Sequence, residues 1–249
     1  MKLFELVNLN HSYAKNIVLK NINLSYDSDD FLAIIGPNGG GKSTLAKIIL
    51  KLIKNKNLKY LALERNQIGY VPQNTSASDN FRIRVIDLVL MGLLDKKFFI
   101  NKKENQEKAL QALEQVGIKE LFKRTLNELS GGERQRAYIA RALVSKCKLL
   151  ILDEPSANLD SKGAIDIFNI LAKLHKEGIG IISICHDINI VLAYANKIAY
   201  LNKELILHNN DNKEKSRLLQ HLQSHHSHFC DVELSFDVCA SCERKVLHA

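Results

Sequence analysis

Residues 36–44 read GPNGGGKST and decide the fold class of this 249-residue chain. They fit the pattern G-x-x-x-x-G-K-[ST], whose fixed positions are here Gly36, Gly41, Lys42 and Ser43. The stretch follows the apolar run FLAII and opens a segment with apolar residues at helical spacing, so it joins a strand to a helix. In such a loop the glycines let successive backbone N–H groups point inward, and the helix N-terminus adds partial positive charge. The stretch therefore predicts a phosphate-binding loop.

The residues of this loop have separate expected roles. Lys42 should bind the terminal phosphates of a nucleotide, and Ser43 should ligate Mg²⁺. The other loop residues expected to contact the nucleotide are Gly36, Asn38, Gly39, Gly40, Gly41 and Thr44. An ordinary glycine-rich turn is the alternative, and the length of the loop, its setting and its Lys-Ser-Thr ending all argue against it.

A pair of carboxylates, Asp153 and Glu154, ends the apolar run KLLIL at residues 148–152. A run that is apolar throughout suits a parallel strand buried on both faces, and the carboxyl edge of such a sheet is where ligands bind. Asp153 should therefore contact Mg²⁺, and Glu154 should orient and polarise the attacking water as a general base. Taken alone, an Asp-Glu pair after a strand is equally typical of a solvated turn.

The rest of the chain alternates between strand-like and helix-like patterns. Apolar runs typical of strands occupy residues 3–9, 17–25, 31–35, 67–71, 148–152, 179–184, 198–201 and 204–208. Helical patterns occupy residues 42–52, 82–128, 161–177 and 188–195. The first of these helices should bury Leu45, Ile48, Ile49 and Leu52 on one face. Such β–α alternation predicts an α/β fold, with a mostly parallel sheet and helices on both faces.

Further motifs carry a resemblance to one family. Residues 129–136 (LSGGERQR) resemble the signature segment of ATP-binding cassette (ABC) ATPases. Gln73 in YVPQN resembles the Q-loop of that family, and His186 in ICHD resembles its switch histidine. Residues 156–160 (SANLD) resemble its D-loop, and Tyr13 resembles its adenine-stacking aromatic residue. Because these motifs and the phosphate loop occur in the family's order, the chain is identified as a member of the ABC ATPases.

The resemblance covers residues 1–208 and implies a P-loop NTPase fold of the ABC ATPase type. Such a fold has an N-terminal antiparallel β region, a mostly parallel core sheet and an inserted helical subdomain, which we expect at about residues 82–145. The resemblance also implies that the chain binds ATP and Mg²⁺ and hydrolyses ATP. Residues 209–249 should form a separate tail rich in His and Cys.

The family pattern further implies that two copies face each other head to tail, so that the second copy completes the ATP site of the first. The implied completing residues are Ser130, Gly131, Gly132 and, as the link between the two sites, Asp160. The implied catalytic residues are Glu154, His186, which contacts the γ-phosphate, and Gln73, which links metal and water to a membrane partner. The implied Mg²⁺ ligands are Ser43, Gln73 and Asp153.

Two positions fit the family pattern less closely. Glu133 stands where the family most often has Gln, a variant that should preserve nucleotide contact. Tyr13 lies in a predicted edge strand, where packing explains a tyrosine as well as stacking on adenine does.

We expect ATP hydrolysis by this chain to drive transport through separate membrane subunits. It contains no apolar stretch long enough to span a bilayer, and residues 1–13 lack the core of a signal peptide. The stretch 82–128 resembles the subdomain that receives coupling helices from the permease subunits of importers, although a helical core explains its apolar residues equally well. We expect a peripheral location on the cytoplasmic face of the cell membrane, with an extracytoplasmic metal-binding protein as an indirect partner.

Cys and His residues gather in the tail, whereas Cys147 and Cys185 lie beside apolar runs and should be core residues. Zinc prefers such ligands, and Cys239 and Cys242 have the spacing at which two thiolates bind one tetrahedral metal. The candidate tail ligands for Zn²⁺ are His225, His226, His228, Cys230, Cys239 and Cys242. A solvated tail with accidental clustering and a redox Cys-x-x-Cys pair remain alternatives.

The cassette and the tail together resemble the ATPase subunits of zinc and manganese uptake transporters. The first hypothesis is therefore an importer ATPase for a divalent transition metal, zinc before manganese. A second hypothesis changes the cargo to an iron chelate, haem or cobalamin. A third is a soluble ABC ATPase that acts on nucleic acid or ribosomes. Only the formal charge of +8 supports the third, and a solvated lysine-rich surface explains that charge as well, so we expect no nucleic-acid partner.

Overall fold

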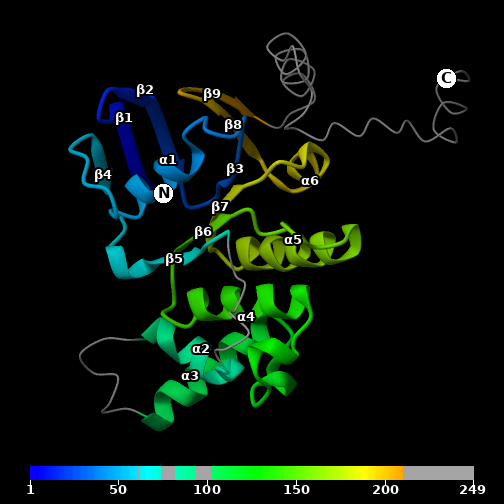
Figure 1. Cartoon of the computed structure of the whole chain (residues 1–249). Coiled ribbons are helices and arrows are strands. Elements are labelled where there is room, and N and C mark those ends of the chain that lie inside the picture. Colours follow the sequence, from blue (N-terminus) through cyan, green and yellow to red (C-terminus); the bar gives the residue numbers. More distant parts are fainter. Residues whose placement is uncertain (61, 74–81, 94–101, 210–249) are drawn as a thin grey trace, which may run out of the picture.

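The computed structural model describes residues 1–60, 62–73, 82–93 and 102–209. Within these residues the chain forms a three-stranded sheet and a six-stranded sheet, with helices packed on both faces of the larger sheet (Figure 1). The predicted tail ligands lie outside the described residues. The division of the chain at residue 208 and the bounds 82–145 of the helical subdomain stay predictions.

The smaller sheet contains the N-terminal strands. Its members are β1 (Lys2–Tyr13), β2 (Asn16–Asp27) and β4 (Leu58–Tyr60). They pair antiparallel in the order β2-β1-β4, which confirms the predicted antiparallel region. The β1–β2 hairpin packs on the core through Phe4 and Tyr26, whose rings stack at 5.2 Å. The short strand β4 is an addition that the sequence patterns did not predict.

The larger sheet is mostly parallel, as predicted. Its members are β3 (Phe31–Ile35), β5 (Ile68–Val71), β6 (Leu149–Asp153), β7 (Gly180–Ile184), β8 (Lys197–Asn202) and β9 (Glu204–Asn209). They lie in the order β5-β6-β7-β3-β8-β9. All neighbouring pairs are parallel except β8 and β9, which are antiparallel. The carboxyl ends of the first five strands in that order therefore share one edge of the sheet.

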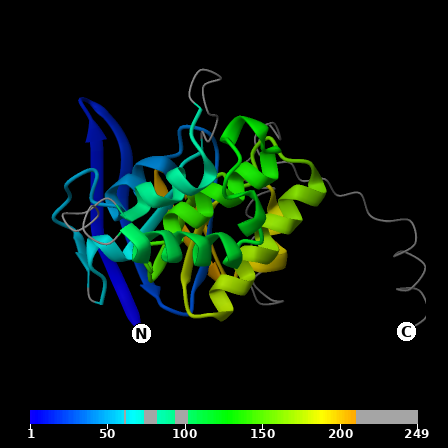
Figure 2. The ribbon, with the colours of Figure 1, turned by 90° about the horizontal axis from the view of Figure 1, so that it is seen from below.

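Helices cover this sheet from both sides. The α-helices are α1 (Lys42–Ile49), α2 (Val85–Leu90), α3 (Lys102–Gln115), α4 (Gly131–Leu143), α5 (Ser161–Lys176) and α6 (Ile188–Tyr194). The 3-10 helices are η1 (Arg65–Gln67), η2 (Met91–Leu93), η3 (Lys119–Leu121) and η4 (Leu126–Glu128). The green helices α2, α3 and α4 gather at one end of the molecule beyond α5, and in Figure 2 they lie in front of the sheet. No helix in the described ranges is long and apolar enough to cross a membrane.

The central strands divide their side chains between two cores. In β3, Phe31, Ala33 and Ile35 face the core formed with helices α2 to α6. Leu32 and Ile34 of the same strand face the core formed with α1 and the N-terminal sheet. All five residues of β3 are apolar because both faces of the sheet are covered at this strand.

One helix prediction was wrong in extent. The first helix ends at Ile49, because the chain turns at Lys51, which has φ 55°. Leu52 therefore leaves the buried face and is 57% exposed. The stretch 82–128 is helical as predicted in its described residues, which form α2, η2, α3, η3 and η4.

Candidate functional site

Four neighbouring parallel strands end at one edge of the larger sheet, and a predicted site segment follows each of them. Gln73 comes after β5, and Asp153 is the last residue of β6, the next strand in the sheet. His186 comes after β7, and Gly36 comes after β3, the fourth of these strands. The strands are aligned so that Asp153 pairs with Ile184 across β6 and β7. The structure thus brings together residues that are distant in the sequence, at the edge where open α/β sheets bind ligands.

The phosphate loop depends on glycines at positions of close backbone approach. Gly36 has φ 144°, and a Cβ atom there would lie 2.1 Å from the backbone oxygen of Leu201 in β8. Gly41 has φ 102°, and its Cβ atom would lie 2.7 Å from Cδ2 of Leu19 in β2. Gly41 is also the N-cap of α1, so the N–H groups of the first helical turn point toward the loop. This combination of loop and helix N-terminus favours anion binding.

Lys42 adds a positive charge to the loop. The residue is only 6% exposed, and its ammonium donates to the backbone oxygens of Gly36 at 2.7 Å and Pro37 at 3.0 Å. These contacts hold the ammonium against the loop. A phosphate bound there would receive a charge-assisted hydrogen bond, which is stronger than a neutral one.

Asp153 supplies a buried carboxylate near the loop. It is 6% exposed, and its Oδ1 atom is buried without a hydrogen-bond partner. Burial raises the pKa of Asp153, and a hydrogen bond with the Ser43 side chain opposes that rise. A buried oxygen that lacks a partner, next to a hydroxyl group, suits a hard cation with oxygen ligands. Ser43 and Asp153 therefore fit Mg²⁺, and the amide of Gln73 lies at the same sheet edge.

The side chain of Glu154 holds Gln73 and His186 together. Its Oε2 atom accepts from Nε2 of Gln73 at 2.6 Å, and its Oε1 atom interacts with Nε2 of His186 at 2.6 Å. A carboxylate oxygen accepts hydrogen bonds, so the Nε2–H tautomer of His186 would be the donor in this contact. The backbone of Glu154 has φ 52°, and its N–H donates to the oxygen of Ile184 at 2.9 Å. The arrangement presents a carboxylate that can accept a proton from water.

Tyr13 lies close to the turn of the β1–β2 hairpin. Its ring is half exposed and meets the ring of His11 edge-on at 4.8 Å. The same hairpin reaches the phosphate loop, because Val18 and Leu19 approach Gly41. Tyr13 therefore offers an exposed flat ring on the hairpin that covers the loop, and such a ring can stack on a base.

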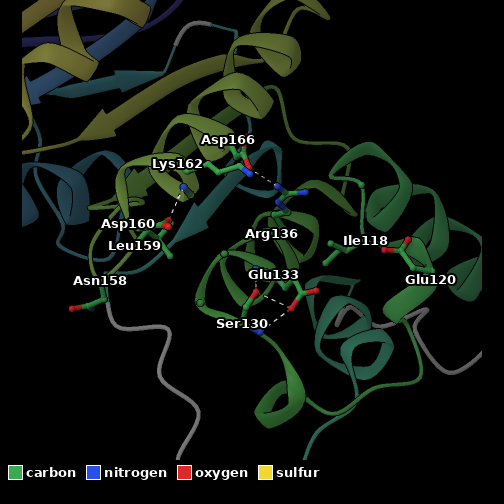
Figure 3. A pocket seen from close by; sticks show the side chains of 14 residues that line it. Ile118, Glu120, Ser130, Glu133, Arg136, Asn158, Leu159, Asp160, Lys162 and Asp166 are labelled. Carbon is green, nitrogen blue, oxygen red and sulfur yellow. Dashed lines mark hydrogen bonds and ion pairs between the residues drawn. The ribbon is translucent and has the colours of Figure 1, made fainter.

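The signature residues line a cleft of about 530 Å³ between α4 and α5 (Figure 3). Ser130 is the N-cap of α4 and Asp160 is the N-cap of α5, so two helix N-termini face it. Its lining contains the predicted residues Ser130, Gly131, Gly132 and Asp160. It also contains Arg136 and Asp166, an ion pair at 3.5 Å that the sequence motifs did not indicate. Among the described residues that line this cleft, none belongs to the phosphate loop. Within one copy of the chain, the signature residues in this cleft therefore lie apart from the phosphate loop.

The two core cysteines are buried, as predicted. Burial raises the pKa of the Cys147 thiol to about 11 and that of the Cys185 thiol to about 12. Both thiols therefore stay protonated at neutral pH. Metal binding requires the ionised thiolate, so neither cysteine is suited to it. Within the described residues, no group of three or more His, Cys, Asp or Glu side chains is placed to hold a metal.

A family model described as ABC transporter matches residues 19–157. The chain belongs to the ABC transporter ATPase family. The matched range includes the phosphate loop, the signature segment and the Asp153–Glu154 pair, on which the resemblance rested. Membership in this family makes the chain an ATP-hydrolysing enzyme.

Relatives of this ABC ATPase include metal transport subunits. It is 38% identical over 212 residues to the manganese transport system ATP-binding protein MntB of Listeria monocytogenes serovar 1/2a, covering 82% of this chain and 88% of that protein. It is 35% identical over 207 residues to the zinc import ATP-binding protein ZnuC of Pasteurella multocida, covering 82% and 75%.

Solved structures of ABC transporter cassettes have the same fold as this chain. A bacterial ABC transporter cassette, solved as a dimer, matches with a TM-score of 0.71 and 28% identity, covering 84% of this chain and all of that one. The predicted cassette fold is therefore confirmed. A cassette solved in a post-hydrolysis state with ADP and Pi, which also matches with a TM-score of 0.71, is a dimer as well.

Proposed function

We propose that this ABC ATPase energises the uptake of a divalent transition metal, zinc before manganese, through separate membrane subunits. The names of two relatives that align over 82% of the chain support this cargo. The observation that carries the enzymatic part is the Glu154 carboxylate, held by Gln73 and His186 at the sheet edge that bears the phosphate loop. The ABC ATPase would act at the cytoplasmic face of the membrane, bound to permease subunits that receive metal from an extracytoplasmic binding protein.

In the proposed mechanism, the sheet edge binds ATP. The N–H groups of the phosphate loop and the Lys42 ammonium bind the phosphates, and Tyr13 stacks on the adenine. Ser43, Asp153 and Gln73 would hold Mg²⁺, which supplies charge neutralisation at the terminal phosphates when bound. The buried Oδ1 atom of Asp153, which lacks a protein partner, supports this role.

Glu154 is the proposed general base. It accepts a proton from the water that attacks the γ-phosphate, a role that requires a carboxylate within hydrogen-bond reach. In the structure, Gln73 and His186 both donate to this carboxylate. With ATP in place, the Nε2–H group of His186 turns to the γ-phosphate and releases Glu154 toward the water.

A second copy would complete the site head to tail. Ser130, Gly131 and Gly132, at the start of α4, would donate to the γ-phosphate held by the loop of the other copy. Asp160, at the start of α5, lines the same cleft and would contact the second copy. Such a closed site excludes bulk water and strengthens the electrostatic contacts to the transferred phosphoryl group.

Replacing Glu154 with Gln should stop hydrolysis and preserve ATP binding. Loss of a general base lowers turnover by roughly 10²–10⁴-fold, whereas the phosphate contacts remain. An ATP-bound dimer should then accumulate, which size-exclusion chromatography with nucleotide analysis of the dimer peak detects. Glu107→Gln, at an exposed carboxylate on α3, is the matched control and should hydrolyse ATP normally. Unchanged hydrolysis by the Glu154→Gln chain would exclude this residue as the base.

The cargo is tested in the membrane complex. The ABC ATPase would be co-purified with its permease subunits, reconstituted in vesicles with the binding protein, and supplied with Zn²⁺, Mn²⁺, an iron chelate, haem or cobalamin. We expect ATP-dependent uptake of Zn²⁺, with Mn²⁺ next, and no uptake in a complex that carries Lys42→Ala. Transport of a chelate, haem or cobalamin without transport of either free ion would refute the proposed cargo and leave the ATPase assignment intact.

We also propose that the C-terminal tail binds Zn²⁺. Cys239 and Cys242 have the spacing of two ligands to one tetrahedral ion, and Cys230 with one histidine would complete four ligands. The candidate histidines are His225, His226 and His228. Metal bound there would buffer or sense the cytosolic concentration of the transported ion.

The full-length chain should bind about one more zinc ion than a chain that ends at residue 209, or than the full-length double variant Cys239→Ser/Cys242→Ser. Equilibrium dialysis of the reduced proteins against Zn²⁺ measures the difference. Ser241→Ala, between the two cysteines, is the control and should bind as much zinc as the original chain. Equal zinc content in all four proteins would rule out the tail site.

A further inference from the structure

The Glu133 side chain accepts hydrogen bonds from Ser130 of the signature segment. Its Oε2 atom accepts from the backbone N–H of Ser130 at 2.8 Å and from Oγ of Ser130 at 2.8 Å. In return, the N–H of Glu133 donates to Oγ of Ser130 at 3.3 Å. The two residues thus form the capping box at the start of α4. A carboxylate of the same chain therefore engages both the backbone donor and the hydroxyl donor of Ser130.

This carboxylate keeps its charge in a cleft that is already acidic. Hydrogen bonds from the backbone and then the side chain of Ser130 lower the pKa of Glu133. The charged residues that line the cleft are Glu120, Glu133, Asp160 and Asp166 against Arg136 and Lys162. Arg136 is paired with Asp166 at 3.5 Å, as the dashed line between them in Figure 3 marks. A phosphate that enters the cleft from a second copy therefore meets an excess of negative charge.

We propose that Glu133 competes with the γ-phosphate for Ser130 and thereby sets the ATP concentration at which two copies close. The inference rests on the proposed head-to-tail dimer. Ser130 can donate its hydroxyl hydrogen to only one acceptor, so its hydrogen bond to the Glu133 carboxylate must break before the hydroxyl donates to the phosphate. Two anions at the same donor also repel each other. Glu133 is therefore a positioning residue that acts through Ser130 and opposes closure.

A second capping box in the chain provides a matched control. Oε2 of Glu128 accepts from the backbone N–H of Thr125 at 2.6 Å and from its Oγ1 atom at 2.9 Å. Those contacts also lower the pKa of Glu128. Glu128 is not among the residues that line the signature cleft. A Glu→Gln change preserves a capping box and removes the charge at both positions, but only Glu133 faces the incoming nucleotide.

The test uses the full-length chain with Glu154→Gln, which should hydrolyse bound ATP roughly 10²–10⁴-fold more slowly. Sedimentation velocity gives the ATP concentration for half-maximal dimer in this parent and in chains that also carry Glu133→Gln or Glu128→Gln. We expect Glu133→Gln to lower that concentration by about fivefold, the effect of one like-charge contact in water, and Glu128→Gln to leave it unchanged. ADP binding to the monomer, measured by calorimetry, should be equal in all three chains, because the phosphate loop lies outside the cleft.

An ATP requirement that is unchanged or raised in the Glu133→Gln chain would overturn the inference. So would an equal shift in the Glu128→Gln chain, or a changed ADP affinity, because either result indicates a general effect on the fold. A parent chain that forms no dimer at any ATP concentration would overturn the proposed dimer as well. The two failures are thus distinguishable.

Discussion

The carboxylate of Glu154 joins three parts of the chain that lie far apart in the sequence. It binds Gln73, which follows β5, and His186, which follows β7, while its own backbone N–H binds the end of β7. These contacts require β5, β6 and β7 to be neighbours, parallel and aligned, because a shift of one residue would turn Glu154 to the other face of the sheet. The two cores that cover the sheet hold this alignment, and the phosphate loop on β3 depends on it as well.

The second half of the proposed catalytic site lies on different elements. Ser130 is the N-cap of α4 and Asp160 is the N-cap of α5. Both line the signature cleft, and none of the described residues that line it belongs to the phosphate loop. The signature donors of a single copy are engaged by Glu133, just as Lys42 of that copy is engaged by carbonyl oxygens of its own loop. Donor groups of each half-site are thus engaged by acceptors of the same copy, and in the proposed dimer the nucleotide would replace these contacts. Closure of the proposed dimer would therefore depend on the balance between the contacts within one copy and the contacts with nucleotide.

Much of this site could be predicted from the sequence, because the phosphate loop, the Asp153–Glu154 pair and the signature are short continuous patterns. The end of α1 could not, because it depends on the backbone conformation of Lys51. Strand β4 was also missed, since three residues form a strand there only by pairing with β1. The Arg136–Asp166 ion pair could not be predicted either, because it forms only where α4 packs on α5. The Ser130–Glu133 contact did leave a signal in the sequence, because S-x-x-E is the pattern of a capping box.

The central claim is that ATP is hydrolysed between two copies, each of which supplies one half of a site. A mixture of two inactive chains tests it most directly. Lys42→Ala damages the phosphate loop, and Gly132→Asp damages the signature at a position where a Cβ atom meets nothing within 4 Å. A mixed dimer contains one site in which both halves are intact. We expect the mixture to hydrolyse ATP although neither variant does so alone, whereas a mixture as inactive as its components would contradict the claim.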